Sequence, residues 1–259
     1  MMMTKRFGRV RPFRTAPSPL PRGNLAMARL RAAHLVLPCV ALTLLTTGCS
    51  LVWTGSLKSA QRTYGVDGTI SALSATTHGG NIEIVPVEAG VPVKVTEKYK
   101  YDDAKPQTTH TVKDGRLTLD SEDCSSGHHC EVGYRVLLPR NASVDLHTSG
   151  GDVTVRGASG GITAETSGGD ITIEDTKTRT AKVKTSGGDV EMSLGAVPDE
   201  VSGRTSGGNV TIRVPKGTYA VDAGTSGGSR KVSVTTDEGS AHKISARSSG
   251  GDVSVLSQQ

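Results

Sequence analysis

The sequence of 259 residues predicts an all-β fold, a stacked parallel β-solenoid with about two short strands in each rung of 18–20 residues. Three observations lead to this fold class. A five-residue motif repeats at a near-fixed spacing, apolar residues alternate on both sides of it, and only 3% of the residues are aromatic. Repetition at such a period indicates one structural unit stacked upon itself, and the scarcity of aromatic residues favours a narrow stack over a globular core.

The repeated motif is Thr-Ser-Gly-Gly-Asp, and its first glycines are spaced by 18, 19, 20, 20 and 23 residues. We expect the two glycines to supply positive φ angles at a tight corner of each rung. Because the rungs stack, the same polar side chains should form ladders along the corner. The corner residues are Gly150, Gly151, Asp152, Gly168, Gly169, Asp170, Gly187, Gly188, Asp189, Gly207, Gly208, Asn209, Gly250, Gly251 and Asp252.

Apolar residues alternate with polar ones before and after each glycine pair, as they do around Gly168 in Ile162/Ala164 and Ile171/Ile173. A period of two over β-branched residues indicates a strand with one buried face. The fifth repeat should slip by two residues to bring Val232 and Val234 inward, as a β-bulge would allow.

The aspartates of the corner suggest two roles. Carboxylates stacked about 4.8 Å apart in water repel by only ~1 kcal/mol, so they can cap the turns without a cation. Calcium binding is the alternative, although calcium-binding solenoids place the aspartate differently in their nonapeptide repeat. We expect turn capping and no metal.

The first 48 residues have the features of a secretory signal, with eight basic residues, no acidic residue and an apolar run from Leu35 to Leu45. The compact signal would begin at Met27. The run is too short to span a bilayer. The ending Leu-Thr-Thr-Gly-Cys resembles a bacterial lipobox, so we expect Cys49 to become the lipidated N-terminus.

Removal of this signal changes the sign of the charge. The whole chain carries 30 basic and 25 acidic residues; without the eight basic residues of the signal, 22 − 25 leaves the mature chain near −3. The basic character therefore belongs to the signal, and no nucleic-acid partner is predicted. The cluster Lys177, Arg179, Lys182 and Lys184 is expected to be a solvated face.

The mature chain divides into three predicted parts: a lipidated tether over 49–65, an irregular N-terminal β region over 66–147 and regular repeats over 148–259. A diverged corner at Gly79 indicates that a first rung lies within the irregular region, and Asp114-Gly115 indicates a hairpin. Because the last repeat ends close to Gln259, we expect that rung to leave its strand edges open.

Two cysteines remain in the mature chain besides Cys49. Cys124 and Cys130 are expected to form a disulfide in an exported protein. A zinc site that also uses His128 and His129, or two free thiols, are the alternatives.

No catalytic constellation is predicted. His147, Ser149 and Asp152 are close in sequence, but the serine recurs in every repeat without a histidine. We expect no enzyme, no cofactor and no small-molecule substrate.

With its repeated Ser-Gly-Gly-Asp motif and alternating apolar residues, the region from Thr69 to Val255 resembles a bacterial family of exported candidate adhesins of unknown function. The resemblance implies a β-solenoid and supplies no catalytic or ligand residues. The expected function is a non-catalytic adhesion or envelope-structural module on the outer face of the cell membrane, with a cell-wall polymer or an envelope protein as partner. A carbohydrate-active enzyme and an envelope stress-sensing accessory are the alternatives.

Overall fold

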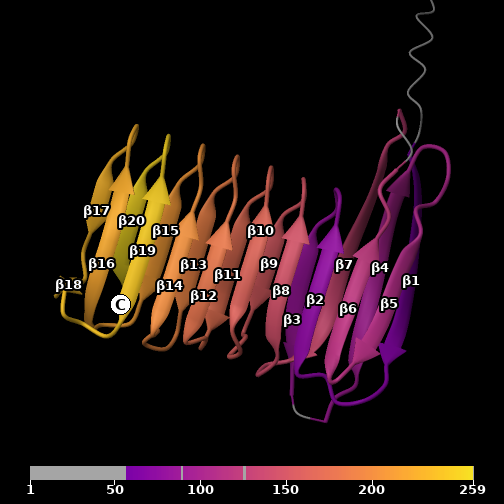
Figure 1. Ribbon diagram of the computed structural model, residues 1–259, viewed down its shortest axis with the longest axis horizontal. Coiled ribbons are helices and arrows are strands. Elements are labelled where there is room, and N and C mark those ends of the chain that lie inside the picture. The colour runs from indigo at the N-terminus through magenta and orange to yellow at the C-terminus, as the bar shows by residue number, and fades with distance from the viewer. Residues whose placement is uncertain (1–56, 89, 125–126, 259) are drawn as a thin grey trace, which may run out of the picture. The chain divides into compact units, whose positions relative to one another are not determined.

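The computed structural model describes residues 57–258, except 89 and 125–126. These residues form two mostly parallel sheets of ten strands that face each other, as predicted (Figure 1). The first sheet contains, in spatial order, β1 (Lys58–Val66), β4 (Val93–Tyr101), β7 (Cys130–Pro139), β3 (Ile82–Val87), β9 (Val153–Arg156), β11 (Ile171–Thr176), β13 (Val190–Leu194), β15 (Val210–Val214), β20 (Val253–Ser257) and β17 (Arg230–Val232). The second contains β18 (Thr235–Thr236), β16 (Thr218–Thr225), β19 (Lys243–Ser248), β14 (Glu200–Arg204), β12 (Thr180–Lys184), β10 (Ile162–Thr166), β8 (Ser143–Thr148), β2 (Ala72–Thr77), β6 (Arg116–Ser121) and β5 (Thr108–Lys113).

The alternating apolar residues form the core between the two sheets. Ile171 and Ile173 of β11 are fully buried, and they pair in parallel register with Val153 and Val155 of the preceding rung. Both strands of a regular rung therefore add apolar residues to one continuous core, which confirms the buried faces predicted from the alternation.

The spatial order of the rungs differs from the chain order at both ends. The C-terminal repeat, β19 and β20, is inserted between the fourth repeat and the fifth, because β19 pairs with both β14 and β16. At the other end, the rung of β6 and β7 lies outside the rung of β2 and β3. The expectation that the last repeat has open edges is wrong: β16, β17 and β18 of the fifth repeat end the stack.

The predicted slip in the fifth repeat is wrong in its register, although Val232 and Val234 both pack against the core as expected. Arg230 and Val232 pair in register with Val253 and Val255, so Arg230 takes the place of the usual inward residue. This arginine is tolerated because its rung is the last in the stack. Its side chain is exposed, and its Nε donates a hydrogen bond of 2.9 Å to the carbonyl oxygen of Ala223.

The N-terminal end of the stack is closed by antiparallel strands. β4 pairs antiparallel with both β1 and β7, and β5 forms a hairpin with β6. The turn of that hairpin has positive φ angles at Asp114 and Gly115, which confirms the predicted hairpin. The expected tether is too long, because residues 58–65 belong to β1, whose Val66 is buried in the core and whose Tyr64 packs against it.

Within the described residues, no helix has the length and apolar character needed to cross a bilayer. The predicted signal, the lipidation site Cys49 and residues 49–56 of the expected tether lie outside the described residues.

Candidate functional site

The second glycine of each corner lies against the backbone of the neighbouring rung. A Cβ atom at Gly169 would lie 2.1 Å from the carbonyl oxygen of Gly151, and one at Gly151 would lie equally close to that of Gly80. None of the corner glycines has a positive φ angle, so the expected reason for their presence is wrong. Glycine is required at this position because any side chain would collide with the next rung.

The threonine of each motif holds the corner together from inside. The hydroxyl of Thr166 donates a hydrogen bond of 2.9 Å to the carbonyl oxygen of Gly151 and accepts one of 3.3 Å from the amide of Gly169. Thr185 repeats this arrangement one rung further along, with Gly169 and Gly188. These threonines are buried, so their hydroxyls satisfy backbone groups that water cannot reach.

The aspartates form a ladder on the outside of the same corner. The Oδ1 atom of each accepts a hydrogen bond from the backbone amide of its counterpart in the next rung, as between Asp152 and Asp170 at 3.0 Å. In spatial order the ladder is Asn81, Asp152, Asp170, Asp189, Asn209, Asp252 and Ser229. Within residues 57–258, apart from the gaps named above, no group of three or more His, Cys, Asp or Glu side chains is arranged as a metal site.

Cys124 and Cys130 are joined in a disulfide, with their Cα atoms 5.9 Å apart. The neighbouring histidines contact carboxylates of the cap. His128 Nδ1 lies 3.4 Å from Asp102 Oδ1, and His129 Nε2 lies 3.2 Å from Glu131 Oε1. The two imidazoles therefore do not converge on the sulfur atoms.

Of the three residues His147, Ser149 and Asp152, the histidine and the aspartate have separate partners. His147 Nε2 is 2.9 Å from Asp145 Oδ1 on the outer face of the second sheet, whereas the Asp152 carboxylate belongs to the corner ladder. The four cations Lys177, Arg179, Lys182 and Lys184 are all exposed, as expected of a solvated face. Arg179 forms two hydrogen bonds of 2.7 Å with Asp199, while Lys182 and Lys184 lie on β12.

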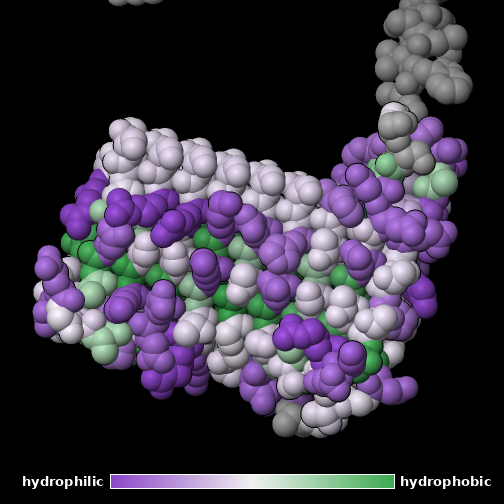
Figure 2. Space-filling view, in the orientation of Figure 1, coloured by the Kyte–Doolittle hydropathy of each residue, from purple (hydrophilic) through white to green (hydrophobic). Residues whose placement is uncertain are grey.

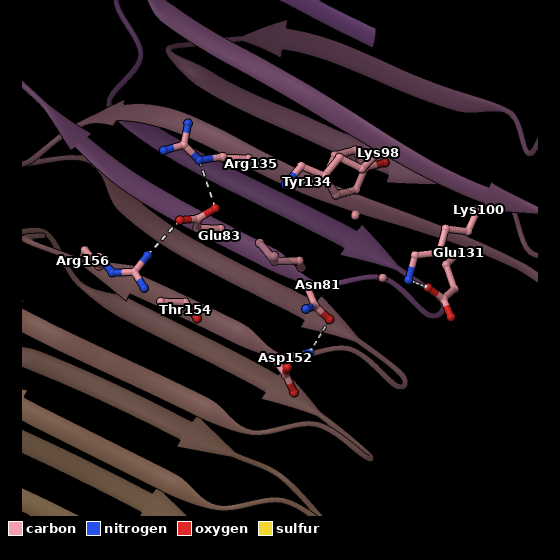
Figure 3. A pocket seen from close by; sticks show the side chains of 13 residues that line it. Asn81, Glu83, Lys98, Lys100, Glu131, Tyr134, Arg135, Asp152, Thr154 and Arg156 are labelled. Carbon is pink, nitrogen blue, oxygen red and sulfur yellow. Dashed lines mark hydrogen bonds and ion pairs between the residues drawn. The ribbon is translucent and has the colours of Figure 1, made fainter. Parts of the chain in front are cut away.

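A depression of about 290 Å³ lies on the outer face of the first sheet, where the ladder begins (Figure 3). Its lining includes Asn81 and Asp152 of the ladder and Lys98 of β4. Gly133 of β7 lines the depression and has no side chain to fill it; a Cβ atom there would lie 3.1 Å from the carbonyl oxygen of Asn81. An outward glycine inside a strand pattern is the sequence signal that could have indicated this site.

Ion pairs surround the depression. Glu83 bridges two arginines, with Arg135 Nε at 3.0 Å from one carboxylate oxygen and Arg156 Nη1 at 2.8 Å from the other (Figure 3). At the opposite side Lys100 Nζ is 3.3 Å from Glu131. Each lining carboxylate thus has a bonded partner, whereas the Lys98 ammonium has no ion pair among the described residues.

A second polar group, which the sequence did not reveal, is buried at the capped end of the core. Glu97 is 1% exposed and accepts hydrogen bonds from the hydroxyls of Tyr64 at 2.9 Å, Thr108 at 3.2 Å and Tyr99. Burial, together with the hydrogen bond to Glu97, raises the pKa values of Tyr64 and Tyr99. Burial also raises the pKa of Tyr134, whose hydroxyl has no hydrogen-bond partner within the described residues.

The Toastrack DUF4097 family model matches residues 66–256, which include every rung of the stack. The chain belongs to this family. The match begins at the last residue of β1, so it covers both the antiparallel cap that follows and the repeats. A comparison with curated proteins finds no match.

Two solved structures are similar to this chain at low sequence identity. A proposed cell adhesion protein from Clostridium sporogenes is 13% identical, covers 78% of this chain and 100% of its own, and superposes with a TM-score of 0.43. A candidate adhesin from Bacteroides fragilis is 15% identical, covers 79% and 99% of the two chains, and has a TM-score of 0.44.

Proposed function

We propose that the mature protein is a lipid-anchored module on the outer face of the bacterial cell membrane that binds an envelope component and catalyses no reaction. The observation that carries the proposal is the state of the acidic groups in the depression. Glu83, Glu131 and Asp152 are each held by an ion pair or by a backbone amide of the next rung. A general acid or base needs a carboxylate whose proton can move to or from a substrate, and these carboxylates serve to fix the surface.

The depression suits recognition of a polar group. The Lys98 ammonium, the Asn81 amide and the hydroxyl of Thr154 are different kinds of hydrogen-bonding group around one site. β7, β3 and β9 are braced by the Arg135–Glu83–Arg156 ion pairs, which continue to Glu174 at 2.9 Å. The Lys100–Glu131 ion pair joins β4, which carries Lys98, to β7. A surface fixed in this way loses little conformational entropy on binding.

The anchor rests on Cys49 and the signal that precedes it. Two or three acyl chains would hold the protein stably, whereas a single chain gives only marginal attachment. Such an anchor keeps the stack at the membrane, where a cell-wall polymer or another envelope protein is within reach.

The first test is intact-mass analysis of the membrane fraction, with Cys49→Ala compared against Cys39→Ala, which changes a cysteine inside the signal. We expect wild type and Cys39→Ala to begin at Cys49 with added acyl mass, and Cys49→Ala to lack that mass. A soluble or unprocessed wild-type chain would refute the anchor.

The binding half of the proposal is tested on isolated cell envelopes from cells that lack the protein. Lys98→Glu, in the depression, should reduce the fraction bound, while Lys94→Glu, an exposed outward position of the same strand, should not. Equal behaviour of these two variants would remove the depression from the proposal.

A further inference from the structure

Three cations occupy consecutive register positions on the outer face of the second sheet. Lys184 of β12 pairs in register with Arg204 of β14, and Arg204 pairs with Arg247 of β19. Neighbouring strands are about 4.8 Å apart, and like charges in directly opposed positions destabilise a sheet. The row needs a source of negative charge.

The two outer cations have such a source, and the middle one does not. Lys184 Nζ lies 2.8 Å from Glu165 on one side, and Arg247 binds Asp222 at 2.5 Å on the other. Arg204 has no ion pair among the described residues and is exposed. Its guanidinium is therefore an unneutralised charge flanked by two others.

Arg204 borders a groove that runs along the stack. Two adjoining depressions of about 540 and 460 Å³ share Glu200 and Ser245, and together they extend from β6 to β16. Figure 2 shows a row of hydrophilic residues beneath the pale corner residues, with apolar residues visible in a band below that row. The groove is thus polar along one side and partly apolar at its floor.

Hydroxyl groups are present along this floor. Thr163, Ser202 and Ser245 stand on three strands of the groove. The Oγ atom of Ser245 is buried and has no hydrogen-bond partner in the part of the chain that the structure describes. A buried hydroxyl without a partner loses free energy that a ligand hydroxyl would restore.

Acidic residues also border the groove, but they leave Arg204 free. Asp145 is bonded to His147, and Asp222 to Arg247. Glu200 is the first residue of β14 and Arg204 is the last, so the two lie at opposite ends of that strand. Glu238 follows β18 at the end of the stack.

We propose that this groove binds an extended glycan that carries carboxylate groups, with one carboxylate held by Arg204. The guanidinium can receive a carboxylate through two parallel hydrogen bonds, and the serine and threonine hydroxyls pair with the sugar hydroxyls. The inference deepens the proposed function, on which it rests, by assigning the class of envelope polymer and a second binding surface.

The experiment measures binding of the purified full chain to polygalacturonate and to the same polymer with its carboxylates methyl-esterified. We expect binding to polygalacturonate that weakens as salt rises, and little binding to the esterified polymer. Arg204→Ser should weaken binding by about tenfold, a loss of about 1.4 kcal/mol, and Ser245→Ala should weaken it to a lesser degree. The matched control is Lys231→Ser, which removes an exposed cation from the other sheet and should leave the affinity unchanged.

The proposal is overturned by no measurable binding, by equal binding of both polymers, or by an equal loss in Arg204→Ser and Lys231→Ser. Arg204 is exposed, so its variant should fold, which an unfolding midpoint no lower than that of wild type checks. If Arg204→Ser binds like wild type while the protein remains acylated and envelope-bound, only this inference fails. If the chain is not acylated, the anchor fails whatever the polymer result.

Discussion

The Oδ1 atom of Asp170 accepts a hydrogen bond of 2.7 Å from the backbone amide of Asp189, one rung further along the stack. The amide of Asp170 in turn donates to Asp152 at 3.0 Å. At each step a side-chain Oδ1 atom accepts a hydrogen bond from a backbone amide. Asparagine also has this oxygen, which explains why it can replace aspartate at positions 81 and 209.

Two replacements of Asp170 distinguish its role as a hydrogen-bond acceptor from an effect of its negative charge. Asp170→Asn should be nearly neutral, because the amide oxygen is an equivalent acceptor. Asp170→Ala should lower the free energy of unfolding by about 1 kcal/mol, because the Asp189 amide loses its partner. Urea unfolding of both variants checks this. Equal losses would show that the negative charge matters instead.

The two glycines of one corner should differ sharply. Gly169→Ala places a methyl group 2.1 Å from the carbonyl oxygen of Gly151 and should cost about 3 kcal/mol. Gly168→Ala meets its nearest atom at 3.6 Å, an ordinary contact, and is the matched control. Thermal unfolding compares them, and a similar drop in both melting temperatures would contradict the steric explanation.

Thr166→Val keeps the shape of a buried side chain and removes its hydroxyl. The carbonyl of Gly151 and the amide of Gly169 then lose their partner, so we expect a loss of about 1–3 kcal/mol in unfolding free energy. Thr163→Val changes an exposed threonine of the same strand and should cost little. A neutral Thr166→Val would mean that water or relaxation replaces the hydroxyl.

The tyrosines at the capped end should respond differently to loss of the hydroxyl. Tyr134→Phe removes a buried hydroxyl that has no partner among the described residues, so stability should be unchanged or raised. Tyr64→Phe removes a donor to the buried Glu97 and should lower stability by about 1–3 kcal/mol. The order of the two unfolding midpoints is the readout, and the reverse order would contradict the assignment.

Alkaline pH should destabilise the fold. The pKa values of Tyr64, Tyr99 and Tyr134 are raised above the unfolded value of about 10. Between these two pKa values the unfolded chain releases the tyrosine protons and the folded chain keeps them. The contribution of the three tyrosines to the free energy of unfolding is therefore complete below pH ~10 and is lost as the pH rises toward the folded pKa values. Urea unfolding between about pH 8 and about pH 11.5 should show a falling free energy, with a smaller slope in Tyr134→Phe. A flat profile would contradict the raised pKa values.

The sequence by itself determined the repeating unit. The motif spacing and the alternation around it specify two short strands per rung, since a period of two places every second side chain on one face. The alternation alone therefore assigns residues such as Ile171 and Ile173 to the core, where both are buried. The Asp114-Gly115 turn could also be predicted from the sequence, because its conformation depends on those two residues.

Only the tertiary structure decided which rung contacts which. Identical motifs are compatible with any order of stacking, so nothing local indicates that the last repeat inserts before the fifth. That insertion places Arg247 beside Arg204 and makes the fifth repeat the end of the stack, where Arg230 is tolerated. The need for glycine at the corner likewise arises from the backbone of another rung, which is why φ preference alone suggested the wrong reason for Gly169.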